Sequence, residues 1–218
     1  MTEAPRREAV ADLVGGLCYA LLRVYQITAA ATASAPSVEL AERQAGFAQD
    51  EFARHRRLRA RLDELAADPR ASMDRFREAV DAFYEAAQPD RWLEAQAFHF
   101  VGNTITTDFA EIVSGRLDDE TAASVREALT GRTEQEAFAL EQIRAALDAE
   151  GVAARERVAH YTAELVGAAL NNFREALLAS NTLEVVLGGP DDLKEVVLEL
   201  LGRHRERLER LEIEPIDD

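Results

Sequence analysis

Apolar residues recur at spacings of three and four along nearly the whole chain, and glycines and prolines interrupt this pattern only at wide intervals. Leu13, Leu17, Leu21 and Val24 form one such stripe. Residues with this spacing share one face of an α-helix, whereas a half-buried strand alternates apolar and polar residues. No segment between the interruptions alternates in that way. The pattern therefore predicts an all-α fold.

The interruptions divide the chain into helices joined by short loops. Short connections place neighbouring long helices antiparallel, so we expect a four-helix bundle with two accessory helices. At 218 residues the chain is long enough for one domain with a substantial core. We predict a single domain over residues 1–218, with its core from about 6 to 211 and an acidic tail at 212–218. The expected helices span about 6–33, 38–67, 72–87, 91–114, 119–149, 153–187 and 191–211.

Composition limits the partners and the compartment. The net charge of −16 disfavours binding to nucleic acid or an anionic membrane, so neither tRNA nor a membrane is an expected partner. Arginines cluster at 54–61 and 203–210, but nearby glutamates favour solvated helix faces over contact with RNA. The single cysteine, Cys18, permits no internal disulfide. No apolar run approaches the roughly 18 residues that span a bilayer, so we expect a soluble cytoplasmic protein.

Five charged residues interrupt helix faces that are otherwise apolar. Each lies three or four positions from apolar neighbours, so each should point toward the helical core. Buried charges are costly unless they are paired or bound to a metal. We therefore expect these side chains to form a buried charge network. They are Glu51, Arg54, Asp108, Arg132 and Glu136.

The histidines are weaker candidates for chemistry. His55 lies about 100° around the helix from Arg54, so it should face the helix flank, although it could join Glu51 at a spacing of four. His99 and His204 lie on core faces, where we expect hydrogen-bonded core histidines. His160 should be exposed.

A metal centre is the alternative to a charge network. Di-iron carboxylate bundles take one carboxylate from each of two helices and a Glu-x-x-His pair from each of two others. Here Glu51 is followed at that spacing by Arg54, which cannot give up its proton to bind a metal. The helix of Glu136 contains no histidine, and the first helix has no inward acid. The remaining candidate metal ligands are Glu51, His55, Asp108 and Glu136.

Four segments of the chain carry a family resemblance: Cys18-Tyr-Ala-Leu-Leu, Asp50-Glu-Phe-Ala-Arg-His-Arg-Arg-Leu, Phe100-Val-Gly-Asn with Asp108-Phe, and Ala137-Phe-Ala-Leu-Glu-Gln-Ile-Arg-Ala-Ala-Leu. They resemble an actinobacterial ferritin-like family that is related to the tRNA hydroxylases acting on methylthio-isopentenyl-adenosine. The resemblance covers about residues 11–211. It implies a ferritin-like bundle and, in members with an intact di-iron site, Glu at position 21 and His at position 54. This chain has Leu21 and Arg54 there, so most of the implied ligands are replaced.

These observations support one leading hypothesis and one alternative. The overall acidity counts against a further reading, in which a tRNA-binding relative keeps substrate recognition without chemistry through the arginines at 54–61. In the first, guanidinium groups replace the metal as counter-charge, and the protein is a non-catalytic structural or interaction protein without a cofactor. It would have no catalytic residues, a protein partner that the sequence does not name, and a modest expectation of a homodimer. In the second, the protein is a metal-dependent oxygenase or hydroxylase that binds iron through a rewired carboxylate and histidine site.

Overall fold

The computed structural model describes residues 3–129 and 131–211, and within them every regular element is a helix. The all-α prediction is therefore confirmed. The predicted acidic tail at 212–218 lies outside the described residues. The elements are α1 (Glu3–Ala30), the 3₁₀ helix η1 (Ala31–Ser34), α2 (Val38–Leu65), α3 (Pro69–Asp74), α4 (Arg77–Ala86), α5 (Trp92–Ala97), the π-helix η2 (Phe98–Gly102), α6 (Asn103–Ser114), α7 (Asp119–Leu129), α8 (Thr133–Glu150), α9 (Val152–Ala179), α10 (Thr182–Leu187) and α11 (Pro190–Arg210).

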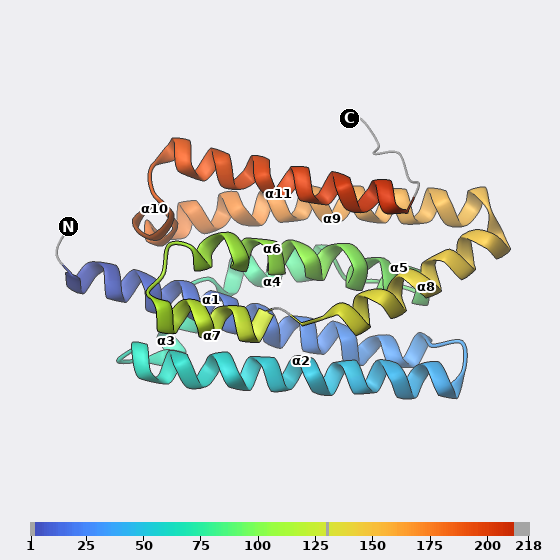
Figure 1. Cartoon of the computed structure of the whole chain (residues 1–218), viewed down its shortest axis with the longest axis horizontal. Helices are drawn as coiled ribbons and strands as arrows, with labels where there is room; N and C mark the ends of the chain where they lie inside the picture. Colours follow the sequence, from blue (N-terminus) through green and yellow to red (C-terminus); the bar gives the residue numbers. More distant parts are fainter. Residues whose placement is uncertain (1–2, 130, 212–218) are drawn as a thin grey trace.

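The long helices lie side by side with their axes nearly aligned (Figure 1). The helices α1 and α2 form one edge of the bundle, α9 and α11 run along the opposite edge, and α4, α6, α7 and α8 lie between them. The helix α1 packs most extensively against α2 and α3, whereas α9 packs against α4 and α11 against α6. As expected from the short loops, the sequential pairs α1–α2 and α9–α11 run antiparallel.

Three of the predicted helices are broken. The segment expected as one helix over 119–149 divides into α7 and α8, because Gly131 has a left-handed backbone with φ of 77°. The segment 153–187 divides into α9 and α10 where the Ser180 hydroxyl accepts a hydrogen bond from the Thr182 backbone N–H at 3.1 Å. The segment 72–87 divides into α3 and α4, and the helix expected over 91–114 contains the π-helix η2.

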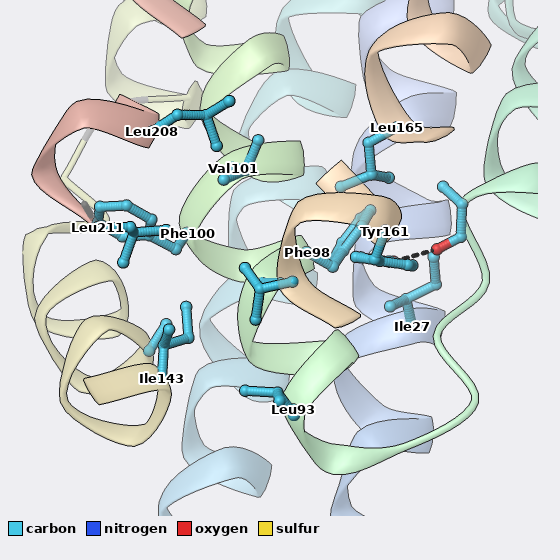
Figure 2. Close-up of a cluster of buried hydrophobic side chains, with 14 of the residues drawn as sticks. Ile27, Leu93, Phe98, Phe100, Val101, Ile143, Tyr161, Leu165, Leu208 and Leu211 are labelled. Carbon is cyan, nitrogen blue, oxygen red and sulfur yellow. Dashed lines mark hydrogen bonds between the residues drawn. The ribbon is translucent and has the colours of Figure 1, made fainter. Parts of the chain in front are cut away.

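One apolar cluster joins α1, α5, η2, α8, α9 and α11 (Figure 2). Phe98, Val101 and Leu165 are at most 1% exposed within it. The Tyr161 hydroxyl donates a hydrogen bond of 2.5 Å to the Ala87 carbonyl, which satisfies the polar end of this buried ring. A second cluster fills the other end of the bundle around Leu21, Leu58 and Leu129.

The helices α1 and α3 cross at close range. A Cβ atom at Gly15 would lie 2.6 Å from the backbone carbon and oxygen of Ser72, so the crossing requires a glycine.

The helix α1 is also apolar over a long stretch. By length and composition, Ala4–Ser34 would suffice to span a membrane, which corrects the expectation that no such segment exists. Since 56% of its most apolar window is buried inside the bundle, α1 serves here as a core helix.

Candidate functional site

The centre of the bundle holds an ion pair between Glu51 of α2 and Arg132, the N-cap residue of α8. Arg132 Nε donates to Glu51 Oε1 at 2.7 Å, and Arg132 Nη2 donates to Glu51 Oε2 at 2.7 Å. Both side chains are 1% exposed. The guanidinium therefore occupies both carboxylate oxygens in the bidentate geometry that gives the strongest hydrogen bonds of this kind.

The break between α7 and α8 positions the arginine. The helix α7 ends at Leu129 and the chain turns at Gly131, so Arg132 caps the start of α8 rather than lying inside a longer helix. Arg132 Nη1 then donates to the Leu129 carbonyl at 2.8 Å and to the Thr107 hydroxyl at 2.9 Å. The carbonyls at the end of a helix lack partners within the helix, so this side chain satisfies one of them as well as Glu51.

A second guanidinium lies beside the pair. Arg54 Nε is 3.8 Å from Glu51 Oε1, and Arg54 Nη2 donates to the Gly131 carbonyl at 2.9 Å. The Arg54 side chain is 13% exposed, so it closes the site toward solvent. Glu51 thus faces two positive charges, and the pair with Arg132 is the shorter and the more buried.

The ion pair determines the protonation of its members. Burial opposes ionisation of Glu51, but the charge and hydrogen bonds of Arg132 outweigh it and lower the pKa of this carboxyl. Burial likewise opposes the charge on Arg132, whereas the Glu51 carboxylate raises the pKa of the guanidinium. The two groups therefore form a charged pair at neutral pH, each holding the other in its ionised form.

A cluster of amides surrounds His99 in the π-helix η2, next to the ion pair. His99 is 1% exposed, and its Nε2 lies 2.7 Å from the amide nitrogen of Gln44. Its Nδ1 lies 3.3 Å from the side-chain amides of both Asn103 and Gln135. Burial lowers the pKa of His99 to about 4, so the ring is neutral at pH 7. The expectation of a hydrogen-bonded core histidine is confirmed.

Asp108 does not join this cluster. Its carboxylate binds two arginines of α11, with Arg207 Nη1 2.6 Å from Oδ2 and Arg203 Nη1 3.2 Å from Oδ1. Thr107 faces Arg132, and consecutive residues of a helix point about 100° apart, so Asp108 faces α11 instead. The prediction of one network of five charges is therefore corrected: the structure places Glu51, Arg54 and Arg132 together and Asp108 in a separate ion-pair group.

Glu136 also lies outside the central cluster. It is half-buried in the first turn of α8 and forms no ion pair with a described residue, whereas its neighbour Gln135 is 5% exposed and reaches His99. Gln135 faces His99 in place of Glu136 because the break at Gly131 resets the phase of the helix.

Gln44 and Gln135 are the two members of the His99 cluster that sequence reasoning missed. Gln44 lies three residues from Phe47 and seven from Glu51, so its position on this face could have been recognised.

His55 turns away from Glu51, toward α1. Its Nδ1 donates to the Cys18 carbonyl at 2.9 Å, and its ring stacks on Phe52 at 5.9 Å between centroids. The expectation that it faces the helix flank is confirmed.

Cys18 itself is fully buried, and burial raises the pKa of its thiol to about 12, which leaves it protonated. His160 is exposed as expected, with a side chain that is 73% exposed.

The donor set does not suit a di-iron centre. Both oxygens of Glu51 are bound by Arg132, and the two nitrogens of His99 face side-chain amides. Leu21 is fully buried where the resemblance implies a carboxylate, and Arg54 lies where it implies a histidine. Among residues 3–129 and 131–211, no three His, Cys, Asp or Glu side chains come together as a metal-binding group. The four candidate ligands Glu51, His55, Asp108 and Glu136 are thus not assembled into one site.

Comparison with known proteins identifies a family. The model of a family described as a ferritin-like domain of actinomycetes matches residues 4–189 of the 218-residue chain. This range includes the whole of the Glu51, Arg54 and Arg132 site and the π-helix with His99. Among curated proteins, no sequence matches the chain.

Proposed function

Since the chain belongs to the ferritin-like domain family of actinomycetes, we propose that it is a metal-independent, non-catalytic member of that family with a structural or interaction role. The observation that carries this proposal is the bidentate pair of Glu51 with Arg132 at the centre of the bundle. The guanidinium supplies there the positive charge that a metal ion would otherwise bring to a buried carboxylate.

The charge balance of the site supports the proposal. One carboxylate, Glu51, faces the guanidiniums of Arg132 and Arg54, while His99 is neutral. An incoming cation would have to displace Arg132 and leave its charge buried without a partner. Breaking a buried ion pair in this way costs about 3–5 kcal/mol, which a metal would have to recover from a single carboxylate.

The amide cluster supports it as well. Gln44, Asn103 and Gln135 are weak metal ligands compared with carboxylates, and they bind the ring nitrogens of His99 that a metal would need. Buried polar contacts between side chains of different helices favour one register of the helices over others. A role in fixing the bundle agrees with these contacts better than a role in oxygen chemistry.

Thermal unfolding tests the proposal. A ligand at one hundred times its Kd stabilises the folded state by about 2.7 kcal/mol, so a resident metal would shift the melting temperature clearly. We expect the same melting temperature with a chelator, with Fe(II), with Mn(II) and with Zn(II). A rise of several degrees with Fe(II) that Glu51→Gln abolishes would favour the metal-dependent oxygenase instead.

The homodimer stays a prediction, which sedimentation velocity checks.

A further inference from the structure

A cavity of about 170 Å³ lies between α1, α4, α6, α9 and α11, apart from the ion pair. The helix α9 packs on α4 and α11 on α6, and the cavity is lined by residues of all four of these helices. Leu170 lines the cavity and is 41% exposed, which places an opening to solvent at that residue.

The lining is apolar and mostly aliphatic, and aromatic rings form part of it. Phe83, Phe109 and Phe173 contribute rings, and the rings of Phe109 and Phe173 meet edge to face at 6.4 Å between centroids. An engineered apolar cavity of about 150 Å³ is known to stay dry and to bind benzene, so this volume suits one ring with a small substituent. Aromatic walls favour an aromatic guest, because rings attract each other in edge-to-face and offset arrangements.

One polar group in the lining has no partner. His204 is 9% exposed, and its Nδ1 is buried without a hydrogen bond to any described residue. The other polar side chains are occupied: Tyr84 bonds to Thr106, and Asn172 donates to the Ala79 carbonyl at 2.5 Å. The expectation of a satisfied core histidine at 204 is therefore wrong for Nδ1, and a buried polar atom of this kind is rare without a reason.

The lining residues also determine the charge of a guest. They include no Asp, Glu, Lys or Arg. The nearby Arg203 and Arg207 are bound to Asp108. Burial and the charge of Arg207 lower the pKa of His204 to about 4, so this ring is neutral at pH 7. An ionised guest would lose its hydration without gaining a counter-charge, which excludes carboxylates and amines.

We propose that the cavity binds a small neutral phenol, with the ring against the phenylalanines and the hydroxyl group hydrogen-bonded to His204 Nδ1 after the His204 ring turns to expose this buried nitrogen to the cavity. A hydroxyl group suits this position because it can donate or accept, and so pairs with either tautomer of a neutral imidazole. The site is independent of the metal question, since none of its lining residues belongs to the Glu51 cluster.

Calorimetric titration of the full chain with p-cresol and with toluene tests the proposal, because the two probes differ only in the hydroxyl group. We expect one p-cresol per chain. His204→Leu should weaken p-cresol roughly two- to twelve-fold, the effect of one hydrogen bond, and leave toluene unchanged. Ala169→Leu, which adds volume in the lining, should abolish binding of both probes. Ala176→Leu is the second filling variant if the first does not fold.

Three results would overturn the proposal. The wild-type chain could bind neither probe at millimolar concentration, and a dimer in sedimentation velocity would then point to a second copy over the opening. Both probes could bind with affinities that neither filling variant changes, which would place them elsewhere. Finally, p-cresol could bind His204→Leu as tightly as the wild type, which would remove His204 from the site.

Discussion

Glu51 in α2 and Arg132 at the start of α8 are 81 positions apart in sequence and meet through two hydrogen bonds of 2.7 Å, with both side chains 1% exposed. A pair of this kind adds little net stability, because two charges lose their hydration. Its effect is one of specificity: the carboxylate fixes where α8 begins relative to α2. Removing one partner is far more costly than removing both.

A double-mutant cycle measures this directly. We expect Arg132→Met and Glu51→Leu each to lower the free energy of unfolding by about 3–5 kcal/mol, since each leaves a buried charge without its partner. The double variant should cost less than either single variant, because it leaves no buried charge without a partner. Urea denaturation gives all the values. The exposed pair Arg59 and Asp63 is the matched control, where Arg59→Met should cost under about 1 kcal/mol. Additive single effects at Glu51 and Arg132 would contradict the account.

Arg54 should matter less than Arg132. The sequence places Arg54 on the turn after Glu51 and predicts that its removal is strongly destabilising. In the structure its Nε is 3.8 Å from the carboxylate, compared with 2.7 Å for Arg132. We therefore expect Arg54→Leu to cost less than Arg132→Leu in urea denaturation under the same conditions. An equal or larger cost for Arg54→Leu would make Arg54 the principal counter-charge of Glu51.

The buried histidines should make stability depend on pH below neutrality. Burial lowers the pKa of His99 to about 4, against 6.5 for the unperturbed group. Between these values the unfolded chain binds a proton that the folded chain does not, so stability is complete above pH 6.5 and falls as the pH drops toward 4. The loss is at most about 3 kcal/mol, at 1.36 kcal/mol per unit of pKa.

His204 has a similarly lowered pKa. His99→Gln should therefore remove about half of the slope with which the free energy of unfolding falls between pH 6.5 and pH 4. The exposed His160 provides a control for the substitution itself, and His160→Gln should leave the urea midpoint at pH 7 close to that of the wild type. Glu51 does not contribute in this range, because its lowered pKa affects stability only below 4.5. Urea midpoints at pH 7, 6 and 5 measure the effect. A slope in His99→Gln equal to that of the wild type would show that His99 takes up a proton in the folded state.

Gly15 and Gly46 give opposite predictions for the same substitution. A Cβ atom at Gly15 would meet the Ser72 backbone at 2.6 Å, and neither helix can yield by rotating a side chain. We expect Gly15→Ala to cost about 1–3 kcal/mol, as overpacking does. Gly46 lies inside α2 with nothing within 4 Å of its Cβ position, so Gly46→Ala should add roughly 0.5–1 kcal/mol. Melting temperatures that move in the same direction for both variants would contradict the crossing of α1 and α3.

The apolar spacing predicted the fold and the burial of Glu51, Asp108 and Arg132 correctly, since all three are at most 4% exposed. It could not show which charges meet. Asp108 is one residue from Thr107, which faces Arg132, and that single step turns it toward α11. The face of a residue is readable from spacing only while the helix is regular, and η2 changes the phase just before α6.

The break at Gly131 could have been predicted. Thr133-Glu134-Gln135-Glu136 follows the glycine and has the Thr-x-x-Glu pattern typical of a helix start. Treating 119–149 as one helix placed Glu136 on the core face instead of Gln135. The π-helix at Phe98–Gly102 has no comparable signal, because an extra residue in one helical turn depends on packing rather than on local propensity. The amide contacts of His99 were unpredictable for the same reason.

The most direct test of the central claim is the metal content of the purified full chain made in iron-replete cells, measured by mass spectrometry beside an optical spectrum. If the Arg132 guanidinium replaces a metal at Glu51, the folded protein will contain well under one iron, manganese or zinc per chain. One or two irons per chain that Glu51→Gln removes would contradict the account, and Glu51 would then be a metal ligand.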